Sequence, residues 1–416
     1  MMNWKDKFSL DAKAIKASDI RELLKLLDDP SILSFAGGIP DPALFPMNKV
    51  AEIRKNLESH PDLNRQSMQY SKTEGYNPLR QWVADKYSSA ETEISQENVL
   101  ITNGAQQSLT LLATALIDAA TPIAVANPTY LGALQIFGTR RPNYITVDTD
   151  ENGIIIKSLK SAFQKGVKLL YTIPDFQNPG GMIIPEDRRK KIIELAHEFD
   201  VIILEDTAYR ELYYDAPPPP SLLTLEGQFL GEGQWHQAGL VIQIGTASKT
   251  LMPALRVGWT IAPLDILEKL VMLKQSNDLH SSTLNQIITH ELSSSGLETH
   301  IDKLRDVYGR RRDTMVDALR SYMPNCATFS RPAGGMFVWI TLAEDMDASE
   351  LLQKALATEK LAFVPGAAFF ANGGGENTFR LSFSTCDDKD IIDGVRRLST
   401  LIQREHLQKV HPKQWS

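Results

Sequence analysis

The chain has 416 residues, and its 44 lysine and arginine residues against 51 aspartate and glutamate residues give a formal net charge of −7. Hydrophobic residues make up 43 % of the chain, which allows a sizeable core and excludes a disordered or fibrous protein. A net negative chain has no long-range attraction to nucleic acid or to anionic lipid, so neither is an expected partner.

The cysteine count and the hydropathy pattern predict a protein of the cytoplasm. Cys326 and Cys386 form neither a Cys-x-x-Cys pair nor a disulfide framework, so no metal site and no oxidising compartment are indicated. The amino terminus carries charges without a following apolar run, which is not the pattern of a secretory signal. The most apolar stretch, residues 111–126, is interrupted by Asp118 and is shorter than the roughly 20 residues of a membrane span.

In chain order, the first predicted element is a short helix over residues 18–27, whose leucine and isoleucine residues form one apolar stripe. Short β-rich runs then alternate with longer helical segments, which predicts an α/β fold: a mostly parallel central sheet with helices on both faces. We expect its strands at residues 99–102, 123–127, 168–173, 201–205, 240–244 and 257–262.

The pattern changes towards the end of the chain. A long helix is predicted from Gly296 to about residue 323, followed by separated strands at residues 337–341, 361–364 and 378–384. This predicts a large α/β domain and a smaller α+β domain, with the amino-terminal segment packed on the small domain and beside the active site. The expected limits of the three parts are residues 1–48, 49–310 and 311–416.

Residues that follow the predicted strands are the candidates for a site, because open α/β sheets bind ligands beyond the carboxyl ends of their strands. Gly104, Ala105 and Gln106 begin a helix whose backbone N–H groups suit a phosphate, with an ordinary strand-to-helix turn as the alternative. Asp206, with Tyr209 three residues on, follows an apolar strand. A carboxylate there needs a partner, and a structural ion pair is the alternative interpretation.

A lysine and an arginine follow another predicted strand. Thr246, Ser248, Lys249 and Arg256 together could bind a phosphate. Lys249 could also act as a nucleophile that forms a Schiff base when burial lowers its pKa, whereas a solvated lysine is the plainest interpretation of this residue alone. Neither a Gly-x-Gly-x-x-Gly nor a Walker-type motif is present, so a dinucleotide or nucleoside triphosphate is not favoured.

Seven motifs occur in order along the chain: Tyr70, Gly104-Ala105-Gln106, Pro128-Thr129-Tyr130, Gln177-Asn178-Pro179, Asp206-x-x-Tyr209, Ser248-Lys249 with Arg256, and Arg380-Leu381-Ser382. Together they resemble the class I/II aminotransferases of fold type I, which use pyridoxal 5′-phosphate. The likeness extends from about residue 15 to about residue 402. The segments 18–24 and 34–40 resemble the 2-aminoadipate and kynurenine aminotransferase group.

The resemblance implies a catalytic set of Lys249, Asp206 and Tyr209. Lys249 would form the Schiff base with the cofactor and then transfer a proton as general base and acid. Asp206 would keep the pyridine nitrogen protonated, which makes the ring an electron sink. Tyr209 and Asn178 would bind the phenolic oxygen of the cofactor, and Tyr130 would stack on the cofactor ring.

The resemblance also implies a phosphate site shared between two subunits. The phosphate would be held by Gly104, Ala105, Gln106, Thr246, Ser248 and Arg256. Tyr70 would reach the phosphate of the neighbouring subunit, so a homodimer with shared active sites is expected.

For the substrate, the family's arginine at the place of Arg380 clamps the α-carboxylate, with Asn178 nearby. The alternation of the predicted strand puts Arg380 on the side facing away from the core, so a solvent-facing arginine is the alternative. Gly38 would let the backbone approach the substrate closely. Ser18 and Arg21 would recognise a side-chain carboxylate or adapt to an aromatic substrate; a helix N-cap and a solvated arginine are the alternatives.

The chain departs from the family at two places. It has Gly245-Thr246-Ala247-Ser248-Lys249 where Gly-Ser-x-Ser-Lys is usual, and Asn178-Pro179-Gly180-Gly181 where Asn-Pro-Thr-Gly is frequent, which makes the substrate side chain less predictable.

The expected function is a ping-pong aminotransferase acting on 2-aminoadipate, an aromatic amino acid or a similar donor, with 2-oxoglutarate as acceptor. A lyase, decarboxylase or racemase of the same fold type is the alternative within enzymes. An aminotransferase-like effector-binding module is the alternative from another class.

Overall fold

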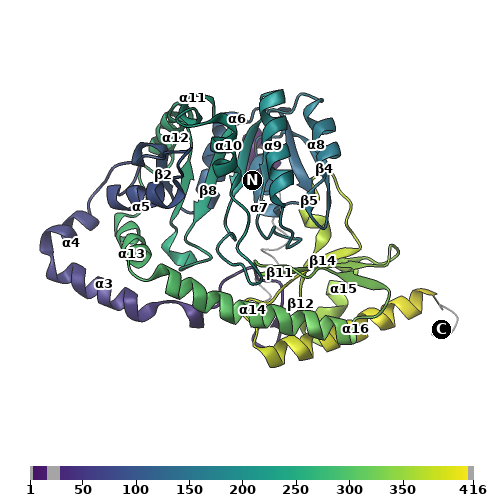
Figure 1. Cartoon of the computed structure of the whole chain (residues 1–416). Coiled ribbons are helices and arrows are strands. Elements are labelled where there is room, and N and C mark those ends of the chain that lie inside the picture. The colour runs from purple at the N-terminus through teal and green to yellow at the C-terminus, as the bar shows by residue number, and fades with distance from the viewer. Residues whose placement is uncertain (1–2, 16–28, 411–416) are drawn as a thin grey trace.

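The computed structural model describes residues 3–15 and 29–410 (Figure 1). Its central sheet has eight strands in the order β2-β9-β8-β7-β6-β3-β4-β5. The strands are β2 (Val99–Thr102), β3 (Pro122–Asn127), β4 (Asn143–Asp150), β5 (Gly153–Ile154), β6 (Leu169–Thr172), β7 (Ile202–Asp206), β8 (Val241–Thr246) and β9 (Gly258–Ile261). Strands β8, β7, β6, β3 and β4 are parallel, whereas β9 is antiparallel to both its neighbours and β5 is antiparallel to β4. The predicted mostly parallel α/β sheet is therefore confirmed.

Each central strand contributes side chains to two separate cores. Ile123 and Val125 of β3 belong to one hydrophobic cluster, whereas Ala124 and Ala126 belong to another. The first cluster includes residues of α6, α7 and α12, and the second includes residues of α8, α9 and α10. Both faces of the sheet are thus covered by helices, which is why these strands are nearly continuous apolar runs in the sequence.

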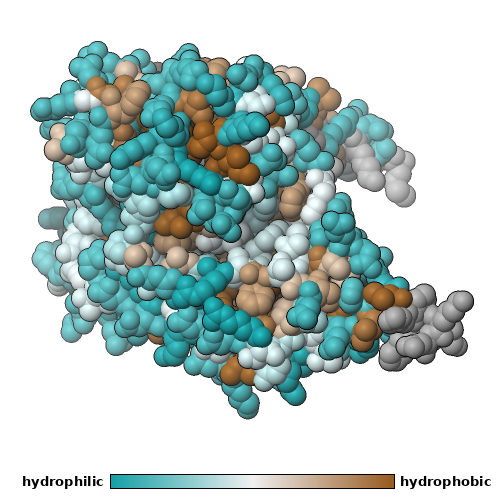
Figure 2. All heavy atoms as spheres, turned by 45° about the vertical axis from the view of Figure 1, so that its right-hand side comes forward, coloured by the Kyte–Doolittle hydropathy of each residue, from teal (hydrophilic) through white to brown (hydrophobic). Residues whose placement is uncertain are grey.

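Helices occupy most of the remaining chain (Figure 1). They are α1 (Leu10–Ala14), α3 (Met47–Ser59), α4 (Pro61–Ser67), α5 (Asn77–Tyr87), α6 (Ala105–Leu116), α7 (Leu131–Gly138), α8 (Ile156–Phe163), α9 (Glu186–Phe199), α10 (Leu222–Leu230), α11 (Trp235–Ala238), α12 (Leu264–Asn277), α13 (Thr283–Ser294), α14 (Leu297–Tyr322), α15 (Ala348–Lys354) and α16 (Asp388–Val410). No helix within the described ranges is both long and apolar enough to cross a bilayer. The face drawn in Figure 2 is largely hydrophilic, with hydrophobic residues in separate patches.

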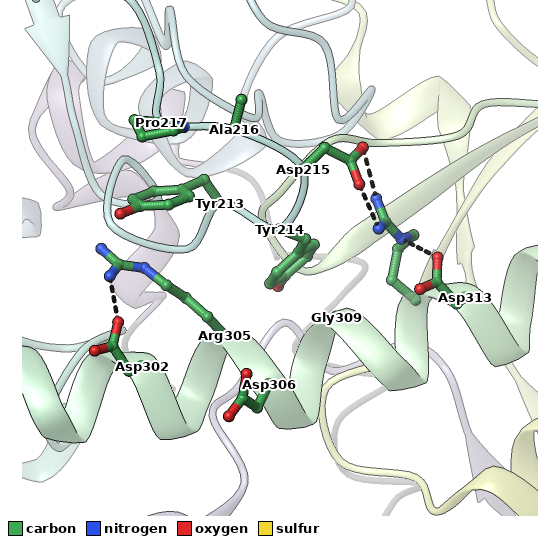
Figure 3. Close-up of a pocket in the computed structure, with 11 residues that line it drawn as sticks. Tyr213, Tyr214, Asp215, Ala216, Pro217, Asp302, Arg305, Asp306, Gly309 and Asp313 are labelled. Carbon is green, nitrogen blue, oxygen red and sulfur yellow. Dashed lines mark hydrogen bonds and ion pairs between the residues drawn. The ribbon is translucent and has the colours of Figure 1, made fainter.

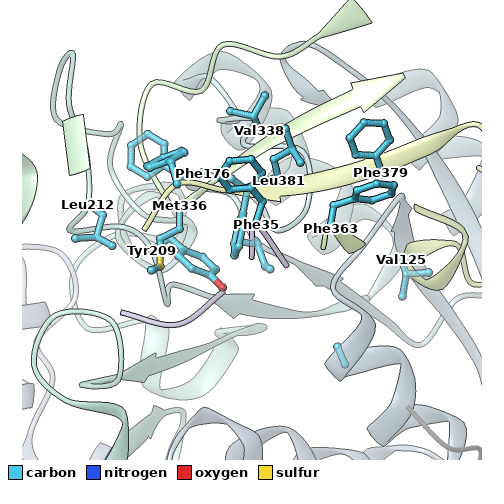
Figure 4. Close-up of a cluster of buried hydrophobic side chains, with 14 of the residues drawn as sticks. Phe35, Val125, Phe176, Tyr209, Leu212, Met336, Val338, Phe363, Phe379 and Leu381 are labelled. Atoms are coloured by element: carbon cyan, nitrogen blue, oxygen red, sulfur yellow. The ribbon is translucent and has the colours of Figure 1, made fainter. Parts of the chain in front are cut away.

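A second, antiparallel sheet has the order β10-β11-β14-β13. Its strands are β10 (Ala327–Phe329), β11 (Phe337–Leu342), β14 (Thr378–Ser382) and β13 (Val364–Pro365). Val338, Phe379 and Leu381 of this sheet share one hydrophobic cluster with Phe35 and with Tyr209, which follows β7 (Figure 4). The small sheet and the segment around Phe35 are therefore packed against the carboxyl ends of the central strands.

The structure corrects one predicted element and adds a strand to the central sheet that was not predicted. The run 361–364 is two strands: β12 (Leu361–Ala362) pairs with β1 (Leu33–Ser34), and β13 pairs with β14. Strand β4 was not predicted because most of its residues are exposed or half-buried, so it lacks an apolar run.

The long helix predicted after Gly296 is confirmed as α14. The proposed domain boundary at residue 310 falls inside this unbroken helix, and the domain limits stay a prediction. The helix predicted over residues 18–27 lies outside the described part of the chain.

Candidate active site

Several predicted site residues, though far apart in sequence, meet at the carboxyl ends of the central strands. Asp206 ends β7, Lys249 follows β8, and Asn178 lies in the loop after β6. Arg380 reaches the same place from β14 of the small sheet. The structure thus brings together one amine, one carboxylate and one guanidinium, whose contacts are described in turn below.

Asp206 is a buried carboxylate, with 3 % of its surface exposed. The Tyr171 hydroxyl donates to Asp206 Oδ2 at 2.9 Å, and the Ala208 N–H donates to Oδ1 at 3.2 Å. Burial raises the pKa of Asp206 to about 6, while the Tyr171 and Ala208 hydrogen bonds and the charge of Lys249 oppose that rise. Asp206 is therefore ionised at neutral pH and close enough to Lys249 to influence it.

Lys249 contacts the amino-terminal segment and is within electrostatic reach of Asp206. Its Nζ donates to the Gly38 carbonyl at 2.9 Å and lies 5.9 Å from the centre of the Tyr209 ring. Burial lowers the pKa of Lys249 to about 8; Arg380 also lowers it, and Asp206 partly restores it. A substantial fraction of this amine is neutral near pH 8, as a nucleophile requires.

Arg380 does not face solvent, which corrects the alternative interpretation of this residue. It is only 3 % exposed because both faces of β14 are covered, and its guanidinium lies 4.1 Å from the centre of the Phe337 ring. Nη1 donates to Asn178 Oδ1 at 2.8 Å, and Nη2 donates to the Ala36 carbonyl at 2.8 Å. The Asn178 amide in turn donates to the Tyr209 hydroxyl at 3.2 Å, so Arg380, Asn178 and Tyr209 form one chain of hydrogen bonds.

The predicted phosphate residues meet at the start of α6. Gly104 precedes this helix with φ of +78°, and a Cβ there would lie 2.5 Å from Nη2 of Arg256. Arg256 Nη2 donates to the Asn103 carbonyl at 3.1 Å. Thr246 Oγ1 contacts Ser248 Oγ at 3.0 Å. Backbone N–H groups, two hydroxyls and one guanidinium are thus gathered at the positive end of a helix, which is a good site for a phosphate.

The remaining predicted residues differ in their placement. Tyr130 is half-buried at the start of α7, and the charges of Asp206, Arg380 and Arg256 all act on its pKa, which burial raises. Tyr70 is 78 % exposed and contacts His280 edge to face. Ser18 and Arg21 lie outside the described residues. Gly38 packs against Phe337, and a Cβ on Gly38 would lie 2.8 Å from that ring.

The donors of this site match the chemical groups of pyridoxal phosphate. Lys249 supplies an amine of lowered pKa for the aldehyde, Asp206 a buried carboxylate for the pyridine nitrogen, and the α6 terminus with Arg256 an anion site. Nε of Arg380 is buried without a hydrogen-bond partner among the described residues, so this guanidinium keeps a donor for a substrate carboxylate.

Two contributors were missed in the sequence. Tyr171 was taken only as part of an apolar strand, although a buried tyrosine hydroxyl needs a partner, and that requirement was a usable signal. Phe337 was assigned to a strand, and nothing in its sequence neighbourhood indicates that its ring lies under Arg380.

A hollow of about 390 Å³ lies between α14 and residues 213–217, and no predicted site residue lines it (Figure 3). Its arginines are already engaged: Arg312 pairs with Asp215 at 2.8 Å, and Arg305 pairs with Asp302 at 2.8 Å. It therefore offers weaker candidate chemistry than the strand-end site.

Known proteins match this chain along nearly its whole length. The model of the family Aminotransferase class I and II matches residues 38–398. The 2-aminoadipate transaminase of Thermus thermophilus is 41 % identical over 405 residues, which cover 97 % of this chain and 98 % of that protein. Aromatic-amino-acid aminotransferase 1 of Thermococcus litoralis is 39 % identical over 416 residues, covering 97 % of this chain and 96 % of that protein.

Solved structures are similar along nearly the whole chain. The α-aminoadipate aminotransferase of Thermus thermophilus, complexed with N-(5′-phosphopyridoxyl)-L-leucine, has 40 % identity and a TM-score of 0.87, and the match covers 97 % of this chain and 99 % of that one. The kynurenine aminotransferase of Pyrococcus horikoshii, in complex with PMP, has 36 % identity and a TM-score of 0.88, covering 97 % and 98 %.

Proposed function

The chain belongs to the class I and II aminotransferases, and from this premise we propose that it moves the amino group of 2-aminoadipate, an aromatic amino acid or a similar L-amino acid to 2-oxoglutarate. The proposal rests on one observation: Lys249, Asp206 and Arg380 lie together at the carboxyl ends of the central strands. Each of these buried groups is suited to a different part of the reaction. As a member of this family the chain is a pyridoxal-phosphate-dependent aminotransferase.

The residues have distinct proposed tasks. The bound cofactor supplies the electron sink that stabilises negative charge at the substrate Cα. Asp206 holds a proton on the ring nitrogen, and Lys249 Nζ accepts the proton from Cα and later donates it. Arg380 and Asn178 bind the substrate α-carboxylate through the fork of the guanidinium and the amide. Tyr209 lies beside Lys249, and Asn178 donates a hydrogen bond to its hydroxyl. In the proposed complex Tyr209 binds the phenolic oxygen of the cofactor ring.

The donor class is supported by the relatives. The names of similar proteins specify 2-aminoadipate, aromatic amino acids and kynurenine. Ser18 and Arg21 are proposed to recognise the substrate side chain. For Arg21→Ala we expect KM to rise much more for acidic than for neutral amino acids; equal losses for both would contradict this role.

The proposed active unit is a homodimer. Tyr70 is 78 % exposed in the single chain, as expected if it serves the neighbouring subunit. Sedimentation at low micromolar concentration tests this proposal, and a monomer that retains full activity would contradict it.

The direct test is the visible absorption spectrum of the purified protein, recorded before and after adding L-glutamate without an oxo acid. Conversion of the yellow cofactor band to the shorter-wavelength pyridoxamine band demonstrates the half-reaction, and a screen of donors beginning with 2-aminoadipate then follows. If glutamate and every donor leave the band unchanged, transamination is contradicted and a lyase, decarboxylase or racemase takes its place.

A further inference from the structure

Tyr171 has no task in the reaction described so far, although its hydroxyl contacts the carboxylate at the centre of the site. We propose that Tyr171 is a positioning residue that holds Asp206 as an ionised, oriented carboxylate for the pyridine nitrogen of the cofactor. This inference rests on the proposed function and deepens it, since it concerns a residue that touches Asp206 and not the substrate.

The geometry places the two side chains side by side in the sheet. Strands β6 and β7 are parallel neighbours, with Tyr171 opposite Leu204 and therefore two residues before Asp206 in register. The Tyr171 hydroxyl donates to Asp206 Oδ2 at 2.9 Å. The Tyr171 side chain is fully buried, and Phe137 of α7 contacts its ring edge to face at 5.5 Å between ring centres. The ring has little freedom to turn away from the carboxylate.

Few other groups can stabilise a charge on Asp206. The Ala208 N–H donates to Oδ1, and Lys249 acts on the carboxylate through its charge, although its amine donates to the Gly38 carbonyl instead. The phenols of Tyr130 and Tyr209 are within electrostatic reach of Asp206, and no hydrogen bond from either to this carboxylate is found in the described residues. Tyr171 is thus the side chain whose hydroxyl donates directly to the carboxylate.

Tyr171 is also suited to remain a donor at any working pH. Burial raises the pKa of Tyr171 well above its ordinary value, and the nearby charge of Asp206 raises it further. The phenol therefore stays protonated, and its hydrogen bond favours the ionised form of Asp206 against the desolvation that favours the neutral form. Without this hydrogen bond we expect the pKa of Asp206 to rise from about 6 by about one further unit.

The test uses Tyr171→Phe in the full chain, stripped of cofactor, and measures the affinity for pyridoxamine 5′-phosphate at pH 5.5 and pH 8.5. This probe forms no bond to Lys249, so the titration of that amine has less influence on the result. A pKa of about 7 instead of about 6 lowers the ionised fraction of Asp206 at pH 5.5 from roughly a quarter to roughly 3 %. The expected result is binding about eightfold weaker than wild type at pH 5.5 and nearly unchanged at pH 8.5.

Two controls separate this role from a general packing effect. Tyr144→Phe removes another tyrosine hydroxyl of the same sheet, one that donates to the Leu134 carbonyl at 3.0 Å, and should leave the affinity at both pH values unchanged. The 1-deaza analogue of the probe, in which carbon replaces the ring nitrogen, should bind wild type and Tyr171→Phe equally.

The inference is overturned if Tyr171→Phe binds as wild type does at pH 5.5, weakens binding by the same factor at both pH values, or weakens the deaza analogue equally. If Tyr171→Phe does not fold, 3-fluorotyrosine at position 171 should strengthen the donor and shift the acid limb of binding to lower pH; no shift overturns the inference. If the wild-type protein binds the probe at neither pH, the proposed function itself is contradicted. If only Tyr171→Phe departs from its expected binding, the inference about Tyr171 is overturned and the proposed function is unaffected.

Discussion

Lys249 is expected to destabilise the cofactor-free protein at neutral pH, and replacing it with methionine tests this expectation. Burial lowers its pKa from 10.5 to about 8, which corresponds to a free-energy cost of about 3 kcal/mol. Methionine fills a similar volume without a charge but loses the hydrogen bond from Nζ to the Gly38 carbonyl, which contributes about 1 kcal/mol. Lys249→Met should therefore be more stable than wild type by about 2 kcal/mol at pH 7.

The sign of the pH dependence follows from which state binds more protons. Between pH 8 and pH 10.5 the unfolded chain keeps the Lys249 proton while the folded chain has lost it, so wild-type stability from this group rises with pH. The difference in free energy of unfolding that favours Lys249→Met over wild type has its full value below pH 8 and should disappear by about pH 10.5.

Urea unfolding of the cofactor-free chain at pH 7 and pH 10, followed by circular dichroism, measures both differences. Lys165→Met, at an exposed position after α8, is the matched control and should differ little from wild type at either pH. A Lys249→Met protein that is less stable than wild type at pH 7, or equally more stable at both pH values, would refute the reasoning.

Three further predictions follow from contacts in and near the site. Arg380→Lys should lower kcat/KM about 100-fold for all amino acids, since a lysine cannot form two parallel hydrogen bonds to a carboxylate; steady-state assays that show a loss for one side-chain class only would contradict this. Gly104→Ala should weaken cofactor binding about tenfold or more, because φ is +78° and the new Cβ would meet Arg256; unchanged affinity in a cofactor titration would place the phosphate elsewhere. Arg189→Met should cost about 3 kcal/mol of stability, measured by urea unfolding, because it leaves the fully buried Asp175 with one cation fewer; a loss below about 1 kcal/mol would show that Arg210 alone suffices.

The central strands were predictable because both of their faces are buried. A strand covered by helices on both sides is mostly apolar, and β2, β3, β6, β7, β8 and β9 are all buried along most of their length. Strand β4 is mostly exposed or half-buried, so its sequence lacks that signal. Local hydropathy therefore located the strands that position the site and missed β4, which does not position it.

The meeting of Asp206 with Lys249 was also predictable, because each follows a parallel strand and such strands end at the same edge of the sheet. The environment of each group was not predictable in this way. Arg380 and Asn178 are 202 residues apart, and their contact depends on how the small sheet packs against the central one. Likewise, the strand pattern of Tyr171 shows only that its ring is buried, whereas the neighbouring strand determines which acceptor its hydroxyl meets.

The sequence by itself thus determined the fold class, the family and the set of side chains at the strand ends, because short-range periodicity and motif order carry that information. Only the tertiary structure decided which of these side chains are desolvated and which donor each acceptor receives. Burial and hydrogen bonding are set by groups from distant parts of the chain, and these interactions shift the pKa values of Lys249 and Asp206 towards neutrality.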